Sequence, residues 1–580
     1  MSTAAIPGAN AHRLSRVALL LLLALFLAAT ALSLRGPYLP FEDDSYIFLR
    51  YSRHIAAGAG PVWNVGDAPV EGYTSVLYQA LLTMAESLGW NAPARGGWIG
   101  IILSLLALVL TWRLAERVNP DRPLLNLLPP LLLALSDEFQ YWATAGMDAP
   151  LYTLLLVAAA LVTLHWFQGR GPAWPVGLVW SLAALARPEA LLLFGLTVVL
   201  AIGGRLARRQ PVMTGLPLIV GLFLAGQLPY LVWRWFTFGY LFPNTYYAKT
   251  GGGLAQLRGG LDYVVASGPR LFAVGWLSER WPALATLLPV VVVLLILLGL
   301  ALRPRRPAAY AYLAGLLLVS LLVVIYNGGD HFFRARFLVP LLPFVAVLLA
   351  AALDAFLSRP AARPLAAAAG LVVALLLAGW GLETGNKVRL DWADARLPAD
   401  QVVPPADGAT LTTLDLWGVG FILMGQKLAE IATPDQSVAA VPIGSIGYFS
   451  GIRVLDMVGI VDPVIAHQPM DPAYTASWRP GHDKGDGAHI LSLEPDFIQL
   501  IDRLTSQPHP GPDDLSLRYK SIVELLALPE FEELYEFCAI PMPNGWYYNL
   551  YRRRATTGPC ESLSPPAAAT EKRPIAGVVE

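Results

Sequence analysis

Long apolar runs separated by polar loops occupy the first 383 residues of the sequence. About eleven of them approach the roughly 20 residues that a helix needs to cross a bilayer. They lie near residues 14–34, 97–115, 123–141, 146–167, 173–186, 188–204, 213–237, 282–302, 308–326, 335–357 and 365–382. Because 55% of the residues are hydrophobic and only 14% are charged, these runs predict an α-helical polytopic membrane domain over residues 1–383.

The first run and one weaker segment determine the predicted membrane topology. Arg13 and Arg16 precede the first run, as in a signal peptide. Its apolar core is long and further spans follow, so we expect an uncleaved span. The segment 74–90 is short and holds Gln79 and Glu86. We predict that it lies in the membrane interface as a helix that does not cross.

The basic residues support this topology. If the N-terminus is cytoplasmic and 74–90 does not cross, the arginine-rich loops all face the cytoplasm, as the positive-inside rule requires. Their arginines are Arg113, Arg117, Arg122, Arg170, Arg205, Arg208, Arg209, Arg303, Arg305, Arg306, Arg359 and Arg363. The loops 35–96, 238–281 and 327–334 then face outward, and the first two are long enough to be expected to carry function.

Some arginines fall on the outer side against this bias. Each of them is expected to pair with a carboxylate or to bind an anion. They are Arg50, Arg53, Arg187, Arg270, Arg334 and Arg336.

The tail, residues 384–560, has an ordinary composition. Strand-like runs at 437–441 and 452–455 alternate with helical stretches at 415–431 and 495–504, which predicts a small mixed α/β domain on the extracytoplasmic side. Residues 561–580 are rich in Pro and Ala and are expected to be disordered. Cys538 and Cys560 could form a disulfide if the tail is outside. A net charge of −1 gives no indication of nucleic-acid binding.

An acidic cluster, Glu42-Asp43-Asp44, follows the first apolar run directly. One carboxylate would cap the helix predicted from Ser45 to Ala57, but capping does not account for three acids together. Adjacent carboxylates raise one another's pKa unless a cation or a hydroxyl donor lies between them. This arrangement suits a general base or a metal ligand.

Further motifs follow in order along the chain. The first outer loop contains Gly-x-Gly-x-Val-x-Asn-x-Gly from Gly58 and Val-Glu-Gly-Tyr-Thr from Val70 to Thr74. Other motifs are found at 142–151, 186–189, 242–249, 328–337, 444–451, 456–463 and 481–486. In these motifs the sequence resembles the GT-C superfamily of membrane glycosyltransferases, and within it the bacterial terminal β-(1→2)-arabinofuranosyltransferases. More distant members are the lipid A aminoarabinose transferase and the protein O-mannosyltransferases.

The resemblance implies a GT-C fold and a sugar transfer from a polyprenyl-phosphate donor to a cell-envelope glycan or glycolipid outside a bacterial cell membrane. It implies that Asp44 or Asp43 is the base, with Asp44 narrowly favoured, and that inversion accompanies the displacement. Expected donor-binding residues are Arg50, Arg187, Asn244, Tyr246, Tyr247, Lys249, Arg334 and Arg336, because fixed cations must stabilise the departing phosphate. Expected acceptor-binding residues are Glu71, Tyr73, Asp330, His331 and His482.

Simpler interpretations of several of these residues stay open. Lys249 could snorkel beside an aromatic belt, Glu189 could neutralise Arg187, and Asp330 could pair with Arg334 in an ordinary loop. His482 could only shape its loop. Asp330 with His331 lacks a third metal ligand, so a divalent cation is an open option and no other cofactor is expected.

Three other functions agree less well with the sequence. A transporter or flippase should show repeated halves with broken helices, and the sequence shows no internal repeat. A ligase or polymerase of lipid-linked oligosaccharides is disfavoured by the acidic pair that follows the first span. A purely structural envelope protein would not need the outer arginines.

Overall fold

A computed structural model describes residues 8–34, 41–90, 92–272, 282–302, 304–331, 334–358, 413–475, 478–514, 516–542 and 545–556. The chain divides into two compact units. The first comprises Met1–Ala399 with Val458–Lys484, and the second comprises Asp400–Met457 with Gly485–Glu580. The predicted span at 365–382, the predicted domain boundary at 383/384 and the predicted tail 561–580 lie outside the described residues.

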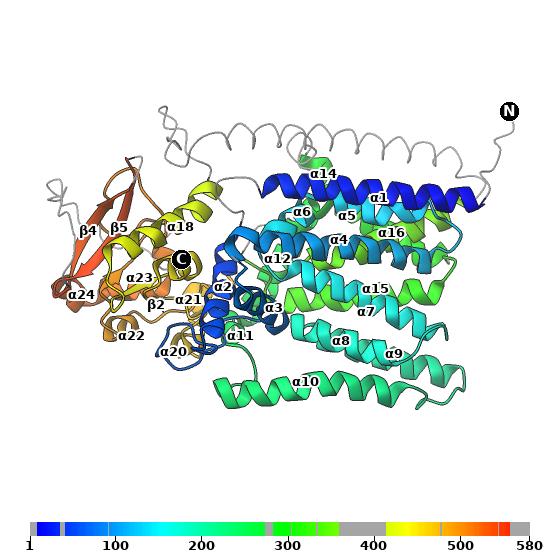
Figure 1. The fold of residues 1–580 in the computed structure, drawn as a ribbon, viewed down its shortest axis with the longest axis horizontal. Coiled ribbons are helices and arrows are strands. Elements are labelled where there is room, and N and C mark those ends of the chain that lie inside the picture. Colours follow the sequence, from blue (N-terminus) through cyan, green and yellow to red (C-terminus); the bar gives the residue numbers. More distant parts are fainter. Residues whose placement is uncertain are drawn as a thin grey trace. The chain divides into compact units, whose positions relative to one another are not determined.

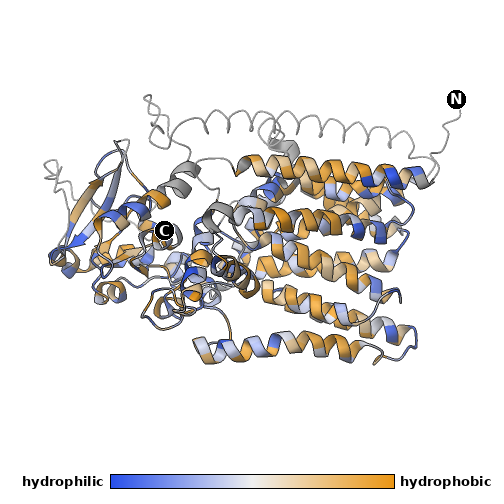
Figure 2. Ribbon diagram, in the orientation of Figure 1, coloured by the Kyte–Doolittle hydropathy of each residue, from blue (hydrophilic) through white to orange (hydrophobic). Residues whose placement is uncertain are grey.

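Long helices running side by side make up most of the first unit (Figure 1). They are α1 (Gly8–Ser33), α4 (Ala92–Val118), α7 (Ala149–Phe167), α8 (Trp174–Ala186), α9 (Ala190–Ala207), α10 (Leu216–Phe238), α14 (Pro282–Leu302), α15 (Pro307–Tyr326) and α16 (Leu342–Leu357). Hydrophobic residues cover most of their length (Figure 2). The protein is therefore a multi-pass membrane protein, as its sequence predicts.

Among the described residues, seven helices are long and apolar enough to cross a membrane, and three further apolar helices are shorter. The predicted span 123–141 is wrong as a single helix. It divides into η1 (Leu125–Leu127), α5 (Leu128–Leu135) and α6 (Asp137–Thr144). Ser136 ends α5 and caps α6 by accepting a hydrogen bond from the Phe139 amide, and Asp137 and Glu138 in the first turn favour a helix start there.

Close backbone approach lets the membrane helices pack. Gly177 of α8 faces α10 so closely that an added Cβ would lie 2.2 Å from the Ile219 carbonyl oxygen. Small residues at such contacts are what helix pairs in a bilayer use, because lipid provides no hydrophobic driving force between helices.

The short helices α2 (Asp43–Ala56), α3 (Val76–Ser87) and α11 (Asn244–Lys249) gather at one end of the bundle, together with the 20-residue α12 (Gly253–Phe272). The first two pack through Phe48 and Tyr78, whose rings meet edge to face at 5.3 Å, and through a hydrogen bond from Gln79 to Ser52. At 12 residues, α3 extends only about 18 Å, which agrees with the prediction that 74–90 does not cross.

The segment Val458–Lys484, with α20 (Pro463–Ala466) and α21 (Pro472–Thr475), belongs to the first unit. Asn244 donates to the carbonyl oxygens of Gly459 and Ile460 at 2.9 and 3.1 Å, and Trp478 donates to that of Gly328 at 2.9 Å. The sequence predicts this segment as part of the C-terminal domain, because its position along the chain does not reveal that it packs with the first unit.

The second unit is a mixed α/β domain, as predicted. Its sheet has the order β2-β1-β3-β5-β4, with β1 (Ser437–Ala440) parallel to β2 (Arg453–Asp456) and β3 (Phe497–Ile498). The last two strands, β4 (Tyr535–Pro541) and β5 (Tyr547–Arg553), pair antiparallel. The remaining elements are α18 (Thr413–Ile431), α19 (Ile443–Ser450), α22 (Gly487–Ser492), η5 (Ser516–Arg518), α23 (Lys520–Ala527) and α24 (Pro529–Leu534).

One helix prediction in this unit is wrong. Residues 495–504 contain the buried strand β3 instead of a helix. A short apolar run has no decisive period, and here pairing with β1 and β5 determines the outcome. Cys538 lies buried in β4, whereas Cys560 lies outside the described residues.

Candidate active site

Asp44 lies in the first turn of α2, at the end of the bundle where the short helices gather. Glu42 at the N-cap position makes no side-chain capping bond, so Asp43 and Asp44 favour the helix start through its dipole. Ser45 anchors the turn by donating to the Ala145 carbonyl oxygen at 2.7 Å. The side chain of Asp44 is 27% exposed and its Oδ2 lies 3.0 Å from Nη1 of Arg336.

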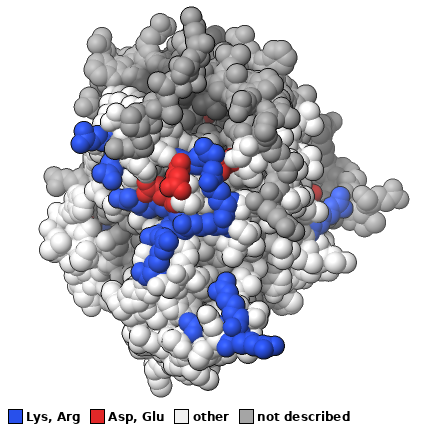
Figure 3. Space-filling model, turned by 90° about the vertical axis from the view of Figure 1, so that its right-hand side faces the viewer, with Lys and Arg blue, Asp and Glu red and all other residues white. Residues whose placement is uncertain are grey.

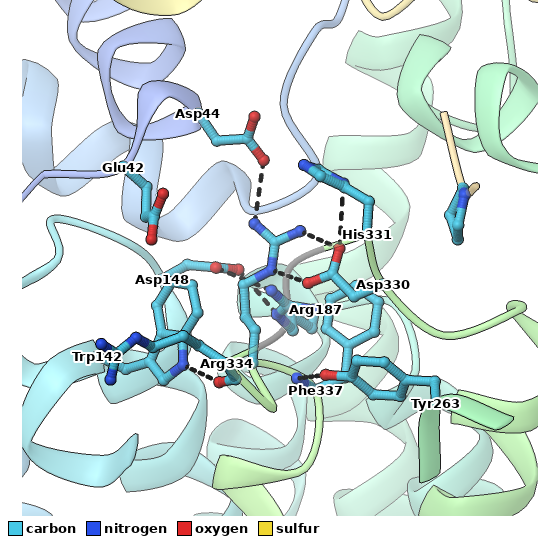
Figure 4. Close-up of polar contacts among 12 residues, drawn as sticks. Glu42, Asp44, Trp142, Asp148, Arg187, Tyr263, Asp330, His331, Arg334 and Phe337 are labelled. Carbon is cyan, nitrogen blue, oxygen red and sulfur yellow. Dashed lines mark hydrogen bonds and ion pairs between the residues drawn. The ribbon is translucent and has the colours of Figure 1, made fainter. Parts of the chain in front are cut away.

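Arg336 joins the two acids of this cluster, Asp44 and Asp330, whose side chains are labelled in Figure 4. Besides the contact with Asp44, its guanidinium donates twice to Asp330, from Nε to Oδ2 at 2.7 Å and from Nη2 to Oδ1 at 2.8 Å. The side chain is only 3% exposed. Arg336 is therefore paired, which is one of the two options expected for the outer arginines. In the alternative interpretation of Asp330 its partner would be Arg334, but Asp330 pairs with Arg336 instead.

Backbone geometry in the loop after α15 positions these groups. Gly329 has φ 75°, and an added Cβ would lie 2.5 Å from the Cβ of Tyr263, so only glycine fits. Ala335 adopts φ 47°, a left-handed conformation that is uncommon outside glycine and often found at functional sites. The Tyr263 hydroxyl also accepts a hydrogen bond from the Phe337 amide at 3.2 Å.

Lys249, the last residue of α11, adds a second cation. An added Cβ on Gly481 would lie 3.1 Å from its Cε, so the segment 458–484 packs directly on the lysine stem. Burial alone would raise the pKa of Asp44, but the charges of Arg336 and Lys249 outweigh it and lower the pKa to about 2. The carboxylate is therefore ionised throughout the physiological range.

Two histidines lie beside the same cluster. Nδ1 of His331 is 3.6 Å from Oδ1 of Asp330, and the rings of His331 and His482 are 4.4 Å apart. Burial lowers the pKa of each to about 3. Both imidazoles are therefore neutral at physiological pH.

Glu42 and Arg334 lie beside the cluster, and both contact Tyr141. The Tyr141 hydroxyl donates to Glu42, and the guanidinium of Arg334 lies 4.2 Å above the tyrosine ring. Trp142 Nε1 donates to the Arg334 carbonyl oxygen at 2.6 Å. Burial raises the pKa of Glu42.

Arg187, the C-cap residue of α8, is neutralised mainly by Asp148. Its Nε and Nη2 each donate to Asp148 at 2.9 Å, whereas the predicted partner Glu189 lies 3.8 Å away. Its guanidinium also lies 4.9 Å from the ring of Phe337, next to Arg336 in sequence.

The first outer loop is held by Arg50, which donates to the Trp63 carbonyl oxygen at 2.8 Å and to Asn64 at 2.9 Å. Glu71 pairs with Arg234 of α10 at 2.8 Å and is 1% exposed. Tyr73 packs edge to face against Tyr51 at 5.0 Å. These contacts give Arg50, Glu71 and Tyr73 structural roles, and none of the contacts described for them reaches Arg336.

The three predicted sugar-binding residues of α11 face other partners. Asn244 binds the segment 458–484, Tyr246 stacks on Phe242 at 4.6 Å, and the ring of Tyr247 lies 4.2 Å from that of His467. The Tyr247 carbonyl oxygen accepts a hydrogen bond from Lys484 at 2.8 Å. The structure therefore groups Lys249 with Asp44, and Asn244 and Tyr247 with the segment 458–484.

Sequence reasoning missed Asp148, Tyr141 and Arg234 as members of these networks. The motif at 142–151 includes Asp148, and an acid at the start of an apolar run is a usable signal. Tyr141 and Arg234 carry no such signal, because their partners are far away in the sequence. Among the described residues, no three His, Cys, Asp or Glu side chains form a group that could hold a metal ion.

The cluster can deprotonate a hydroxyl and stabilise an anion within the same site. Asp44 supplies an ionised carboxylate, Arg336 and Lys249 supply fixed positive charges, and the neutral histidines can position hydroxyl groups. A base and an anion-stabilising group side by side are what a group transfer to an alcohol needs.

The fold is that of GT-C membrane glycosyltransferases. The solved structure of ArnT from Cupriavidus metallidurans, bound to undecaprenyl phosphate, matches with a TM-score of 0.52 at 12% identity, covering 93% of this chain and 99% of that one. This likeness concerns the fold.

Two sequence relatives define the class more closely. Both are named terminal β-(1→2)-arabinofuranosyltransferase. The protein of Mycobacterium tuberculosis is 26% identical over 79% of this chain and 81% of its own length. The protein of Corynebacterium glutamicum is 26% identical over 89% of this chain and 82% of its own. The chain is a membrane glycosyltransferase with the GT-C fold.

A family described as "Domain of unknown function (DUF8728)" matches residues 417–551. The match includes the segment Val458–Lys484, which packs with the first unit. The matched region therefore contributes His482 to the candidate site.

Proposed function

We propose that the protein transfers a sugar from a polyprenyl-phosphate donor to a hydroxyl of a cell-envelope glycan or glycolipid, with Asp44 as the general base. The observation that carries the proposal is the ion-paired constellation of Asp44, Arg336 and Asp330 at one end of the membrane helices. The names of the two arabinofuranosyltransferase relatives favour an arabinofuranosyl donor. The undecaprenyl phosphate bound to ArnT supports a lipid phosphate as its carrier.

The proposed step is a single displacement. The acceptor oxygen forms a bond to the anomeric carbon as its proton passes to Asp44, and the bond from that carbon to the donor phosphate oxygen breaks. The electron pair of the broken bond leaves with the lipid phosphate. One such displacement inverts the configuration at the anomeric carbon.

Two carboxylates of the candidate site face two cations. Asp44 and Asp330 carry two negative charges and face Arg336 and Lys249, which carry two positive charges. An incoming phosphate competes with both carboxylates for these cations. As Arg336 turns to the phosphate, the pKa of Asp44 rises, because one of the charges that lower it is then engaged elsewhere. Donor binding thus makes Asp44 a stronger base at the moment that it is needed.

The charge distribution supports placing this end of the bundle outside the cell. Three buried arginines at this end pair with carboxylates, as Arg187–Asp148, Arg234–Glu71 and Arg336–Asp330. The opposite end has the arginine-rich loops, as the positive-inside rule expects of the cytoplasmic side. The second unit is continuous with the segment 458–484 at Met457 and Gly485, so we expect it to be exported too.

Asp44→Asn tests the assignment of the base. We expect turnover to fall by roughly 10²–10⁴-fold, the usual contribution of a general base, in a membrane assay with polyprenyl-phosphate-linked radiolabelled arabinofuranose and an arabinan acceptor. The variant keeps the size of the side chain, so the folded fraction, followed by size-exclusion chromatography, should not change.

Asp43→Asn tests the other base that the sequence analysis allows, because it removes the neighbouring charge from the same helical turn. We expect it to retain at least about a tenth of wild-type turnover, since a charge in the first helical turn contributes only about 0.3–1 kcal/mol. Full turnover of Asp44→Asn would refute the assignment of the base. Activity of the wild-type protein with a nucleotide-sugar donor only would refute the lipid donor.

A further inference from the structure

A second polar site lies at the other end of the membrane helices. At its N-terminal end α4 adjoins the candidate active site, since an added Cβ on Gly96 would lie 3.0 Å from Phe41. Glu116 and Arg117 lie about 20 residues further along the helix, or about 30 Å. Figure 3 views this end, where basic residues surround a small acidic patch.

Here a cavity of about 620 Å³ opens between helices that are distant in sequence. Its charged and polar lining consists of Arg113, Glu116, Arg117, His165, Arg170 and Arg306. The arginines come from the end of α4, from the connection between α7 and α8 and from the residue before α15. The positive-inside rule explains why such loops are basic, but not why their arginines converge on one cavity.

The arginines of the cavity differ from nearby arginines in whether a carboxylate pairs with them. Arg122 and Arg305 both pair with Asp354 at 2.7 and 2.8 Å, and Arg113 pairs with Glu116 at 3.1 Å. Within the described part of the chain, Arg117, Arg170 and Arg306 form no ion pair. Arg306 only donates to Gln168 at 3.0 Å. Burial and the charges of Arg170 and Arg117 lower the pKa of Arg306, so the three guanidiniums are close enough to repel one another.

The other walls of the cavity are apolar. Leu161, Val162, Pro120, Pro172 and Pro175 line it. Trp174 and Leu178 of α8, near Pro175 in sequence, are 51% and 41% exposed. Exposed tryptophan at the end of a membrane helix is typical of the level of the lipid headgroups.

We propose that this cavity binds a phosphate group through Arg117, Arg170 and Arg306, and that the phosphate belongs to an anionic membrane phospholipid. Planar guanidiniums bind phosphate oxygens through two hydrogen bonds at once, and an added anion would relieve the repulsion among the three arginines. The apolar walls and the exposed Trp174 favour a ligand with acyl chains over a soluble one, and basic pockets between membrane helices are known to hold anionic headgroups.

Native mass spectrometry of the full-length protein in detergent tests the proposal. The probes are dioctanoyl phosphatidylglycerol, dioctanoyl phosphatidylcholine and inorganic phosphate, each titrated separately. We expect one phosphatidylglycerol to bind saturably and more tightly than either of the others. In the double variant Arg117→Gln/Arg170→Gln its Kd should rise by roughly tenfold or more, the effect of losing about 1.4 kcal/mol of binding free energy.

Arg208→Gln/Arg209→Gln is the matched control. Both arginines are exposed after α9 and outside the cavity, and the change in net charge is identical. Phosphatidylglycerol binding should stay within about twofold of wild type. An equal loss in this control, or none in the cavity variant, would overturn the site. Equal binding of phosphatidylcholine would overturn the requirement for an anion, and displacement of the lipid by millimolar inorganic phosphate would overturn the lipid assignment.

Discussion

At the scale of single residues, function depends on which partner each charge has. Arg50, Arg187, Arg234 and Arg336 are all buried arginines. Arg50 binds a carbonyl and an amide, Arg187 and Arg234 each have a carboxylate, and Arg336 alone bridges two carboxylates of the candidate site. Removing one member of a buried ion pair costs about 3–5 kcal/mol. Loss of activity on mutating Arg187 or Arg234 would therefore not identify a catalytic residue.

Lys249→Gln tests the electrostatic coupling at this scale. Asp44 must be ionised to accept a proton, so activity falls as the pH drops through its pKa. Lys249 helps to lower that pKa. We therefore expect the acidic limb of the kcat/KM profile to move to higher pH in the variant, in addition to a lower rate.

Lys249→Arg is the comparison for this prediction. It keeps the charge and should leave the acidic limb near its wild-type position. A limb that stays in place in Lys249→Gln while the rate falls would show that Lys249 only packs against Gly481.

At the scale of elements, the segment 458–484 completes the candidate site. It brings His482 beside His331 and packs Gly481 against Lys249. Asn244, Trp478 and Lys484 hold it in place through hydrogen bonds to backbone carbonyl oxygens. The segment is therefore part of the unit that holds the candidate site, although the chain enters and leaves it from the second unit.

Trp478→Ala should loosen this segment. The variant loses the hydrogen bond to Gly328 and the contacts with Gly252 and Gly259, a loss of about 1–3 kcal/mol. We expect faster hydrogen exchange in peptides from 458–484 and a lower turnover. Trp235→Ala is the control, because Trp235 is 51% exposed on α10 and should leave exchange in this segment unchanged. Equal exchange in the two variants would contradict the anchoring role.

At the scale of the whole molecule, the two ends of the helix bundle differ in how their charges are neutralised. At one end Arg187, Arg234 and Arg336 pair with carboxylates. At the other end Arg117, Arg170 and Arg306 line a cavity and form no ion pair among the described residues, although Arg113, Arg122 and Arg305 nearby do. This asymmetry is what a protein inserted in one orientation is expected to show.

Cysteine labelling in intact cells tests the orientation. Ala57→Cys lies after α2 and Gln210→Cys lies after α9, and both positions are exposed. We expect a membrane-impermeant maleimide to label Ala57→Cys in intact cells and Gln210→Cys only after permeabilisation, with the wild-type protein as the blank. The reverse pattern would invert the topology. Ser45 and Ser437 are unsuitable positions because both are buried.

Several properties could be predicted from the sequence: the membrane-spanning class, most of the long helices, the short helix α3 and the mixed α/β character of the second unit. These follow from local patterns: apolar length, hydrophobic period, and capping residues such as Ser136. The sequence also singled out the residues of the candidate site, Asp44, Lys249, Asp330 and Arg336, because charges beside a membrane span are rare enough to stand out.

The pairing of the charged residues follows from the tertiary structure. Arg336 pairs with Asp44 across 292 residues of sequence, Glu71 pairs with Arg234 across 163, and the segment 458–484 joins the first unit. Such contacts are fixed by how helices and loops pack in space, and nothing in the local sequence of either partner specifies the other. The acidic cluster at 42–44 could thus be noticed from the sequence, but the role of Asp44 depends on an arginine that the fold brings to it.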